Sequence, residues 1–241
     1  GEFADRHITE FSLKDGEKAM IKRVSQAFHK QNKKVVVVLN ICGAMDVATW
    51  QDQVDAILIP WLGGQEGGNA VADVLSGKVN PSGKLPMTFY KDYFDVPGAK
   101  NFPYDQIADA KSMFGDKCEG REPIENYDFT TYTEGIFMGY RGIEKQGIQP
   151  AYPFGFGLSY TTFEFADLKA EKKDNQVVIN ITIKNTGKVS GKEVAQLYFS
   201  APQTVERPIR QLVDFQKTDN LSAGQSQQIT FNLDIQNLSR W

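Results

Sequence analysis

The sequence predicts an α/β domain with a mostly parallel sheet, followed by a small all-β sandwich. Two uninterrupted apolar runs lie in the first third of the chain, within Val35–Leu39 and Ala56–Trp61. A glycine-rich turn and a helical pattern follow the second run. After Pro150, short alternating runs separated by turn residues take over. Uninterrupted runs are typical of strands covered on both faces, and alternating runs are typical of strands with one face in water.

The first helix is expected from Ser12 to about Gln31. Ser12, with Asp15 three residues later, is a typical N-cap pattern. Apolar residues then recur at helical spacing: Met20, Ile21, Val24, Ala27 and Phe28. The run Val35–Leu39 comes next, and we expect it to be a strand covered on both faces by helices.

The stretch Val54–Phe89 is expected to form the crossover unit of a parallel sheet. Its first strand is Ala56–Trp61, and its helix runs from Asn69 to Ser76 with Gly77 as the C-terminal stop. Its second strand is Leu85–Phe89, after the turn Asn80-Pro81-Ser82-Gly83. A strand, a helix and a strand in about thirty residues are typical of a parallel crossover.

Ligands of open parallel sheets gather beyond the carboxyl ends of the strands. We therefore expect a site at the loop Asn40–Gly43 and the turn Gly63–Gly68. The glycines of that turn resemble a phosphate cradle before a helix N-terminus. No Lys-Ser/Thr pair follows them, however, and Glu66 would repel phosphate. Close packing of strand, turn and helix explains these glycines better than nucleotide binding.

The helical and strand patterns fail between Tyr90 and Pro150, which predicts a long ordered loop region. Within it, Thr130–Tyr140 could pair as a short strand. Three later runs predict strands of an antiparallel sandwich that lacks one or two strands at its C-terminal end: Val177–Ile183, Val194–Phe199 and Gln228–Leu233. The predicted domains are therefore an α/β domain over residues 1–95, a loop or linker region over 96–159, and an incomplete β-sandwich over 160–241.

Composition excludes several classes of function. A net charge of −3 provides no basic field for nucleic acid, and no run approaches the length that spans a membrane. Cys42 and Cys118 are too few for a disulfide scaffold, which favours free thiols over a single disulfide. His7 and His29 lie 22 residues apart with no cysteine at metal-ligand spacing. We therefore expect no metal and no cofactor.

Carboxylates are the remaining candidates for catalysis, because no Gly-x-Ser-x-Gly nucleophile motif is present. Five glutamates lie in or beside predicted loops, where a general acid could reach a substrate: Glu2, Glu10, Glu66, Glu125 and Glu134. Each of them is also an ordinary surface charge. Composition alone does not choose among them.

Several long motifs follow one another along nearly the whole chain. They are Gly1-Glu2-x-x-Asp5-Arg6, KKVVVVLN at Lys33–Asn40, WLGGQEGGNAVADVLSGKVNPSGKLPMTF at Trp61–Phe89, YTEGIFMGYR at Tyr132–Arg141, YPFGFGLSYTTF at Tyr152–Phe163, and the NTG, SGKEVAQLY and RPIRQL stretches. In these motifs and their order the sequence resembles the C-terminal portion of glycoside hydrolase family 3 enzymes, most similar to the bacterial β-glucosidases.

The resemblance implies a three-part enzyme with a (β/α) barrel, an α/β sandwich domain and a fibronectin-III-like domain. It also implies retaining hydrolysis of a terminal β-linked sugar, in which two carboxyls lie roughly 5 Å apart. An aspartate of the barrel is the nucleophile, and the acid/base glutamate falls on Glu2 of this sequence. Asp5 and Arg6 would fix the loop and tune the acid by an ion pair.

The sequence departs from the family in two ways. Phe3 stands where the family usually has glycine, and Glu2-Phe3 is also what a common restriction site encodes. The alternative is that Glu2 only occupies the catalytic position by coincidence. The barrel and its nucleophile aspartate are absent, as is the serine that the family's α/β domain offers the sugar. We therefore expect this chain to be inactive alone.

Several alternatives stay open. One is a β-xylosidase or another exo-β-glycosidase of the same family, and another is a non-catalytic scaffold or carbohydrate-binding module. The expected partners are a β-linked oligosaccharide or glucoside and an N-terminal barrel on the same or another chain. A homodimer stays open, and export to a periplasm or out of the cell suits the enzyme class.

Overall fold

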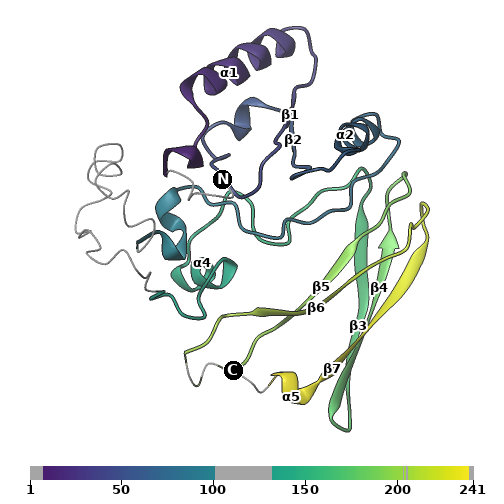
Figure 1. The fold of residues 1–241 in the computed structure, drawn as a ribbon. Coiled ribbons are helices and arrows are strands. Elements are labelled where there is room, and N and C mark those ends of the chain that lie inside the picture. Colours follow the sequence, from purple (N-terminus) through teal and green to yellow (C-terminus); the bar gives the residue numbers. More distant parts are fainter. Residues whose placement is uncertain (1–7, 101–131, 203, 205, 239–241) are drawn as a thin grey trace. The chain divides into compact units, whose positions relative to one another are not determined.

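The computed structural model describes residues 8–100, 132–202, 204 and 206–238 of the chain (Figure 1). The chain divides into two compact units. The first consists of Gly1–Gly67 and Met87–Phe154, and the second of Gly68–Pro86 and Gly155–Trp241. The segment Gly68–Pro86 therefore belongs to the same unit as the C-terminal strands, although it lies far from them in the sequence. The domain boundaries predicted near residues 95 and 160 stay predictions.

The first unit contains a pair of parallel strands with short helices. Its elements are η1 (Ile8–Phe11), α1 (Asp15–His29), β1 (Val36–Val38), η2 (Gln51–Gln53), β2 (Ala56–Leu58), η3 (Tyr93–Asp95), η4 (Pro97–Lys100) and α4 (Tyr140–Gln146). β1 and β2 pair in parallel, with Val36 opposite Ala56 and Val38 opposite Leu58. Both predicted apolar runs thus contain a strand of a parallel sheet.

Helix α1 has a different N-cap from the one that the sequence predicts. The N-cap is Lys14, whose backbone N–H donates to Oε2 of Glu17 at 2.8 Å. Ser12 instead donates its hydroxyl to Oδ2 of Asp46 at 3.5 Å. The prediction was wrong because a partner distant in sequence uses the Ser12 side chain. The helix ends at His29, within two residues of the expected end.

The predicted strand Leu85–Phe89 is also wrong. Phe89 forms only an isolated antiparallel bridge with Tyr152, and its N–H donates to the Tyr152 carbonyl at 2.9 Å. Pro86 has no N–H to donate to a strand ladder, which explains why no strand continues there. β2 pairs with β1, so the connection between the parallel strands is residues 39–55, which include η2.

The expectation that Val35–Leu39 is covered on both faces is wrong as well. Val36 and Val38 are exposed, although Leu39 just beyond the strand is buried. A β-branched run predicts the strand from its local chemistry, but it contains no information about which other segments cover the strand.

The strand that Thr130–Tyr140 was expected to form is not present in the described part of that range, and helix α4 begins only at Tyr140. Residues 130 and 131 lie outside the described ranges, and Tyr132–Gly139 contains turns and no strand. The helix ends at Gln146 and is capped by Gly147, whose φ of 68° is the left-handed conformation that favours glycine at a helix C-terminus. Within the described ranges, no helix combines the length and apolar character needed to cross a membrane.

The core of the first unit gathers side chains from its loops more than from its strands. Its buried hydrophobic residues include Leu39, Met45, Val47, Trp50, Phe89, Tyr90, Ala99 and Ile143. Val47, Trp50 and Phe89 are essentially inaccessible to solvent. The indole N–H of Trp50 donates to the Asp46 carbonyl at 2.9 Å, so the largest side chain of this core is also hydrogen-bonded.

The second unit contains two antiparallel sheets. Helix α2 (Gly67–Leu75) starts at the last residue of the first unit, and the other elements are β3 (Phe163–Lys173), β4 (Gln176–Asn185), β5 (Val194–Phe199), β6 (Gln211–Lys217), β7 (Ser226–Asp234) and α5 (Ile235–Leu238). One sheet has the order β3-β4-β7, and the other pairs β5 with β6. The three predicted strands lie in β4, β5 and β7, whereas β3 and β6 were not predicted.

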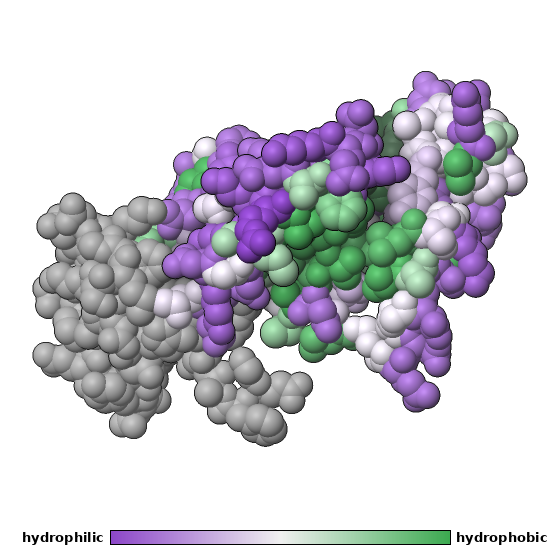
Figure 2. All heavy atoms as spheres, turned by 90° about the horizontal axis from the view of Figure 1, so that it is seen from above, coloured by the Kyte–Doolittle hydropathy of each residue, from purple (hydrophilic) through white to green (hydrophobic). Residues whose placement is uncertain are grey.

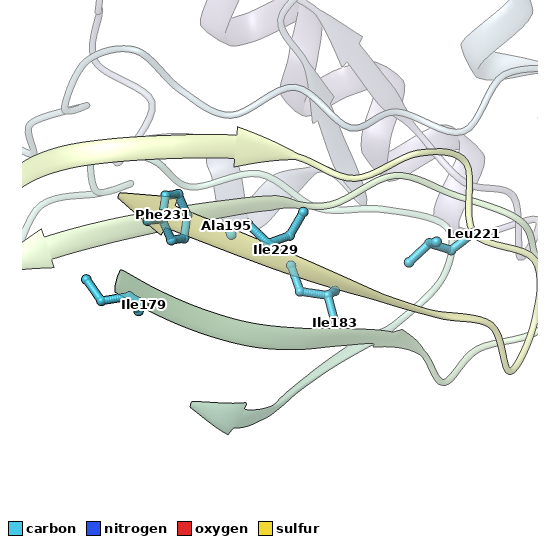
Figure 3. Packing of buried hydrophobic residues seen from close by; sticks show 6 residues of the cluster. All are labelled: Ile179, Ile183, Ala195, Leu221, Ile229 and Phe231. Atoms are coloured by element: carbon cyan, nitrogen blue, oxygen red, sulfur yellow. The ribbon is translucent and has the colours of Figure 1, made fainter. Parts of the chain in front are cut away.

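The two sheets enclose one apolar core (Figure 3). Ile179 and Ile183 come from β4, Ala195 from β5, and Ile229 and Phe231 from β7. Leu221, from the connection between β6 and β7, completes the cluster. Within β4 and β7 these residues are separated by an even number of positions, as expected when one face of each strand points inward.

Two polar side chains attach the NPSGKLP motif to the sandwich. The Asn80 amide donates to the Ser190 carbonyl at 3.0 Å, and its oxygen accepts from the Tyr160 N–H at 2.8 Å. Lys84 pairs with Glu193 at 2.7 Å, and both side chains are mostly buried. The motif therefore has a structural role within the second unit.

We expect Asn80→Ala to destabilise the chain, because three hydrogen bonds to the Asn80 side chain, including one from the Ser159 hydroxyl, are lost. Losses of this kind cost about 1–3 kcal/mol. Urea unfolding of the whole chain measures the change. Asn232→Ala on the exposed side of β7 is the control and should change stability by less than about 0.5 kcal/mol. Equal effects of the two variants would contradict the assigned role of Asn80.

Asp55 connects the C-terminal end of α1 to the start of β1. Its Oδ1 accepts from Lys34 Nζ at 2.7 Å, and its Oδ2 lies 2.8 Å from both His29 Nε2 and the Val35 N–H. Hydrogen bonds from Lys34, from the Val35 backbone and from His29, in that order, hold the pKa of Asp55 well below its usual range. The ionised carboxylate is therefore favoured by the folded state.

This lowered pKa predicts a pH-dependent effect of Asp55→Asn. In the unfolded chain an aspartate has a pKa of about 3.9, so the contribution of Asp55 to stability is complete above that pH and is lost as the pH falls toward the folded pKa. The wild type should melt above the variant at pH 5, and the difference in Tm should shrink between pH 4 and pH 2. A difference in Tm that does not change with pH would contradict this account.

Candidate active site

The predicted location of the site is the carboxyl edge of the parallel strands. The N–H of Leu39 donates to the Leu58 carbonyl at 2.9 Å, one residue beyond the ladder of β1 and β2. The loop Asn40–Ala44 and the turn Trp61–Gly67 therefore leave the sheet from the same edge. At this edge the Ala44 N–H donates to Sδ of Met87 at 3.2 Å, and the Cys42 thiol is free and exposed.

Trp61 has a strained backbone at this edge. Its φ is 58°, in the left-handed region that non-glycine residues adopt at a cost of about 1–3 kcal/mol. Its ring lies 6.2 Å from the ring of the buried Phe89, centroid to centroid. Contact with a core side chain helps to hold the indole in place despite the strain. The structure thus fixes an aromatic side chain where β2 ends.

Asp46 attaches the N-terminal segment to the loop that follows β1. Its N–H donates to the Phe11 carbonyl at 2.7 Å, and its carboxylate accepts from the Ser12 hydroxyl. The same carboxylate accepts from the N–H and the hydroxyl of Thr49. Asp46 is only 2% exposed, so its hydrogen bonds are shielded from water. The segment is therefore fixed at residues 11 and 12.

Aromatic contacts support the same attachment. The ring of Phe11 meets the ring of Tyr93 edge to face, with centroids 5.7 Å apart, and Tyr93 in turn contacts Phe94 at 5.3 Å. Such pairs add about 0.5–1.5 kcal/mol beyond the burial of their area. The N-terminal segment thus has both polar and aromatic contacts with the first unit.

The residues that the resemblance implies for catalysis and its support, Glu2, Asp5 and Arg6, lie outside the described residues, as do His7 and Glu125. Glu10 lies in η1 and Glu66 in the turn after β2, and both are exposed. Among the described residues, no assigned contact joins Glu10 to Glu66.

Glu134 differs from the other candidates. Both of its carboxylate oxygens are buried, and neither has a hydrogen-bond partner in the part of the chain that the structure describes. Gly98 lies beside it, so close that a methyl group at Gly98 would come within 3.3 Å of Oε1. The sequence offered no sign of this burial, because Glu134 stands among turn residues.

The structure describes no group of three or more His, Cys, Asp or Glu side chains that could hold a metal ion. His29, one of the two histidines considered from sequence, instead pairs with Asp55. Two tyrosines of the first unit are held in the neutral, protonated form at ordinary pH, so neither is available as a general base. Burial, with a contribution from Asp95, raises the pKa of Tyr90 to about 12, and burial and Asp52 also raise the pKa of Tyr152.

Asp46 was missed by sequence reasoning. The only signal is its spacing to Thr49, because an aspartate three residues before a threonine can bond the backbone of the next turn. A lone aspartate after a loop is ordinarily a surface charge. Its burial depends on the Phe11 carbonyl and the Ser12 hydroxyl, which are more than thirty residues away.

Residues 1–140 match the family model of the glycosyl hydrolase family 3 C-terminal domain, and residues 193–241 match that of the fibronectin type III-like domain. The chain therefore belongs to glycoside hydrolase family 3, as its motifs indicated. The two kinds of sheet in the two units agree with this pair of domains.

Similar proteins are beta-glucosidases. Beta-glucosidase A of Butyrivibrio fibrisolvens is 38% identical over 96% of this chain and 28% of that protein, and thermostable beta-glucosidase B of Acetivibrio thermocellus is 38% identical over 94% and 27%. The structure of beta-glucosidase 3B from Thermotoga neapolitana in complex with alpha-D-glucose matches with a TM-score of 0.83 and 42% identity, over 95% of this chain and 30% of that one. This chain spans less than a third of these relatives and aligns with their C-terminal part.

We expect Asp46→Ala to destabilise the chain by about 3 kcal/mol, because it removes a buried carboxylate with several hydrogen bonds. Exchange of the amide protons near the Phe11–Ser12 attachment should accelerate beyond the change caused by global unfolding. Asp52→Ala, six residues away and exposed, is the matched control and should change stability by less than about 0.5 kcal/mol. If the two variants behave alike, Asp46 does not hold the segment.

Proposed function

We propose that this chain supplies the general acid/base of a retaining β-glucosidase and that Glu2 is that residue. The observation that carries the proposal is its similarity to beta-glucosidases, 38% identity over 96% of the chain in one case. The proposed enzyme releases glucose from the non-reducing end of β-glucosides or β-linked oligosaccharides. The residue assignment follows the Gly1-Glu2-x-x-Asp5-Arg6 motif.

The proposed reaction has two steps and needs two carboxyls about 5 Å apart. A nucleophilic aspartate, which we assign to the barrel that precedes this region in the family, attacks the anomeric carbon. Glu2 gives its proton to the glycosidic oxygen, so the leaving alcohol departs neutral and a glycosyl ester remains. The Glu2 carboxylate then takes a proton from water as the water attacks the ester, which releases glucose and restores both carboxyls.

The attachment of the N-terminal segment to the first unit supports this role. The N-terminal segment is attached at Asp46, a few residues beyond the carboxyl end of β1, which is the edge where ligands of parallel sheets gather. An acid must be held close to its target to work efficiently. A segment attached at residues 11 and 12 restricts where Glu2 can go. The nucleophile is assigned outside this chain, so the chain alone is expected to be inactive.

The test joins this chain to the preceding region of beta-glucosidase 3B from Thermotoga neapolitana, in place of the matching region of that enzyme. Glu2→Gln should lower kcat/KM for cellobiose by about 10²–10⁴, the usual contribution of a general acid. Glu10→Gln, eight residues further along, is the control and should keep most of the activity.

Azide distinguishes the acid/base from other essential residues. In Glu2→Ala, an aryl β-glucoside with a good leaving group should still form the glycosyl-enzyme, because this step no longer needs the acid. Azide should then accelerate turnover and give β-glucosyl azide. An active Glu2→Gln enzyme, or an inactive Glu2→Ala enzyme that azide does not accelerate, would overturn the assignment.

A further inference from the structure

Trp61 is an unusual residue to find in a left-handed backbone conformation. Four non-glycine residues in the described part of the chain have a positive φ: Asn32, Trp61, Asp167 and Asp174. Asparagine and aspartate tolerate this conformation, because their short polar side chains can bond the local backbone. The bulky indole of Trp61 gains no such compensation. Strained residues of this kind are concentrated at active sites and ligand clamps, so the outlier at Trp61 indicates a function.

Exposure alone does not single out a ligand site on this chain. Figure 2 shows hydrophobic side chains at the surface, bordered by hydrophilic ones. Leu62, directly after Trp61, is itself 67% exposed. Trp61 differs from such side chains because its backbone is strained and its ring contacts the ring of the buried Phe89. The indole is therefore held in place, and it is only half-buried there.

Trp61 lies where a ligand of a parallel sheet is expected. It stands three residues beyond Leu58, the last residue of β2, at the edge from which the loop after β1 also leaves. The turn after Trp61 is tightly packed, since a methyl group at Gly63 would come within 3.1 Å of the Gly67 Cα. The loop after β1 is bonded in turn to Met87 through the Ala44 N–H. Contacts within the first unit thus fix both segments at this edge.

We propose that the indole of Trp61 is a platform for the leaving group of the substrate. The inference rests on the proposed function, in which the acid belongs to this chain and the nucleophile to the barrel. The two carboxyls of a retaining glycosidase flank the scissile bond, and the acid gives its proton to the oxygen of the leaving group. The leaving group therefore lies on the side of the acid, which is the side that this chain supplies.

An aromatic platform selects leaving groups by their shape. A β-linked glucose unit has C–H groups on both faces of its ring, and an aryl group has a flat apolar face. Either face can pack on an indole and remove apolar surface from water. A small ion has no such face. Trp61 is therefore assigned as a specificity-determining residue, which distinguishes large leaving groups from small ones.

The test uses the chimera described above and two substrates that differ in their leaving group. Cellobiose loses a glucose unit, whereas β-glucosyl fluoride loses a fluoride ion, which cannot pack on a ring. Trp61→Gly should lower kcat/KM for cellobiose by about tenfold to a hundredfold and change kcat/KM for β-glucosyl fluoride by less than about twofold. Glycine adopts a φ of 58° without strain, so the substitution removes the ring and relieves the backbone.

Two further variants separate loss of the platform from loss of the fold. Trp61→Phe keeps a ring beside Phe89 but has a smaller face, and kcat/KM for cellobiose should fall by about threefold. Leu62→Ala changes the adjacent and more exposed apolar side chain, and it should not change the ratio of the two kcat/KM values. Partial unfolding would lower both kcat/KM values together.

An equal loss on both substrates in Trp61→Gly, or the same ratio of kcat/KM values in Trp61→Gly and Leu62→Ala, would overturn the proposal. If Trp61→Gly does not fold, Trp61→Phe decides, and an unchanged ratio in that variant would overturn it. These measurements leave Glu2 unaltered. A chimera in which Glu2→Gln stays active, while Trp61→Gly loses activity on cellobiose alone, would refute only the proposed acid/base.

Discussion

The buried carboxylate of Asp46 is the interaction on which the rest of the first unit depends. The carboxylate accepts from Ser12 and from Thr49. The backbone of Asp46 adds a bond to the Phe11 carbonyl and accepts one from the Trp50 indole. A buried carboxylate is stable only where donors surround it, so the segment and the turn need each other. This mutual dependence fixes Phe11 and Ser12 beside the loop after β1. The proposed catalytic role of Glu2 requires such a fixed attachment.

The packing of the chain also explains why its motifs extend so far beyond the proposed acid. NPSGKLP bonds the sandwich through Asn80 and Lys84 and thus has a structural role in the second unit. The strands β1 and β2 form a parallel pair, and Val36 and Val38 of β1 are exposed. Both observations concern the packing of the chain and not its chemistry. Long motifs in such a region reflect packing as much as chemistry.

Local chemistry predicted the helices and strands whose patterns were strong. The spacing of Met20, Val24 and Phe28 placed α1, and the β-branched runs placed β1 and β2. The predicted strand Leu85–Phe89 is wrong because Pro86 cannot donate to a ladder. The wrong N-cap at Ser12 and the failure to identify Asp46 have the same cause. The Ser12 hydroxyl bonds the carboxylate of Asp46, 34 positions away, and no local pattern indicates that contact. The family and the candidate Glu2 came from the resemblance, and no local pattern singled out Glu2 from the other glutamates.

The most direct test of the central claim is a crystal structure of an active enzyme that contains this chain, with glucose bound. We predict that the Glu2 carboxyl lies within hydrogen-bonding distance, about 3 Å, of the anomeric hydroxyl oxygen. It should also lie about 5 Å from the carboxyl that faces the anomeric carbon from the other side. A Glu2 side chain that points into solvent, with a different carboxyl beside the anomeric oxygen, would contradict the account.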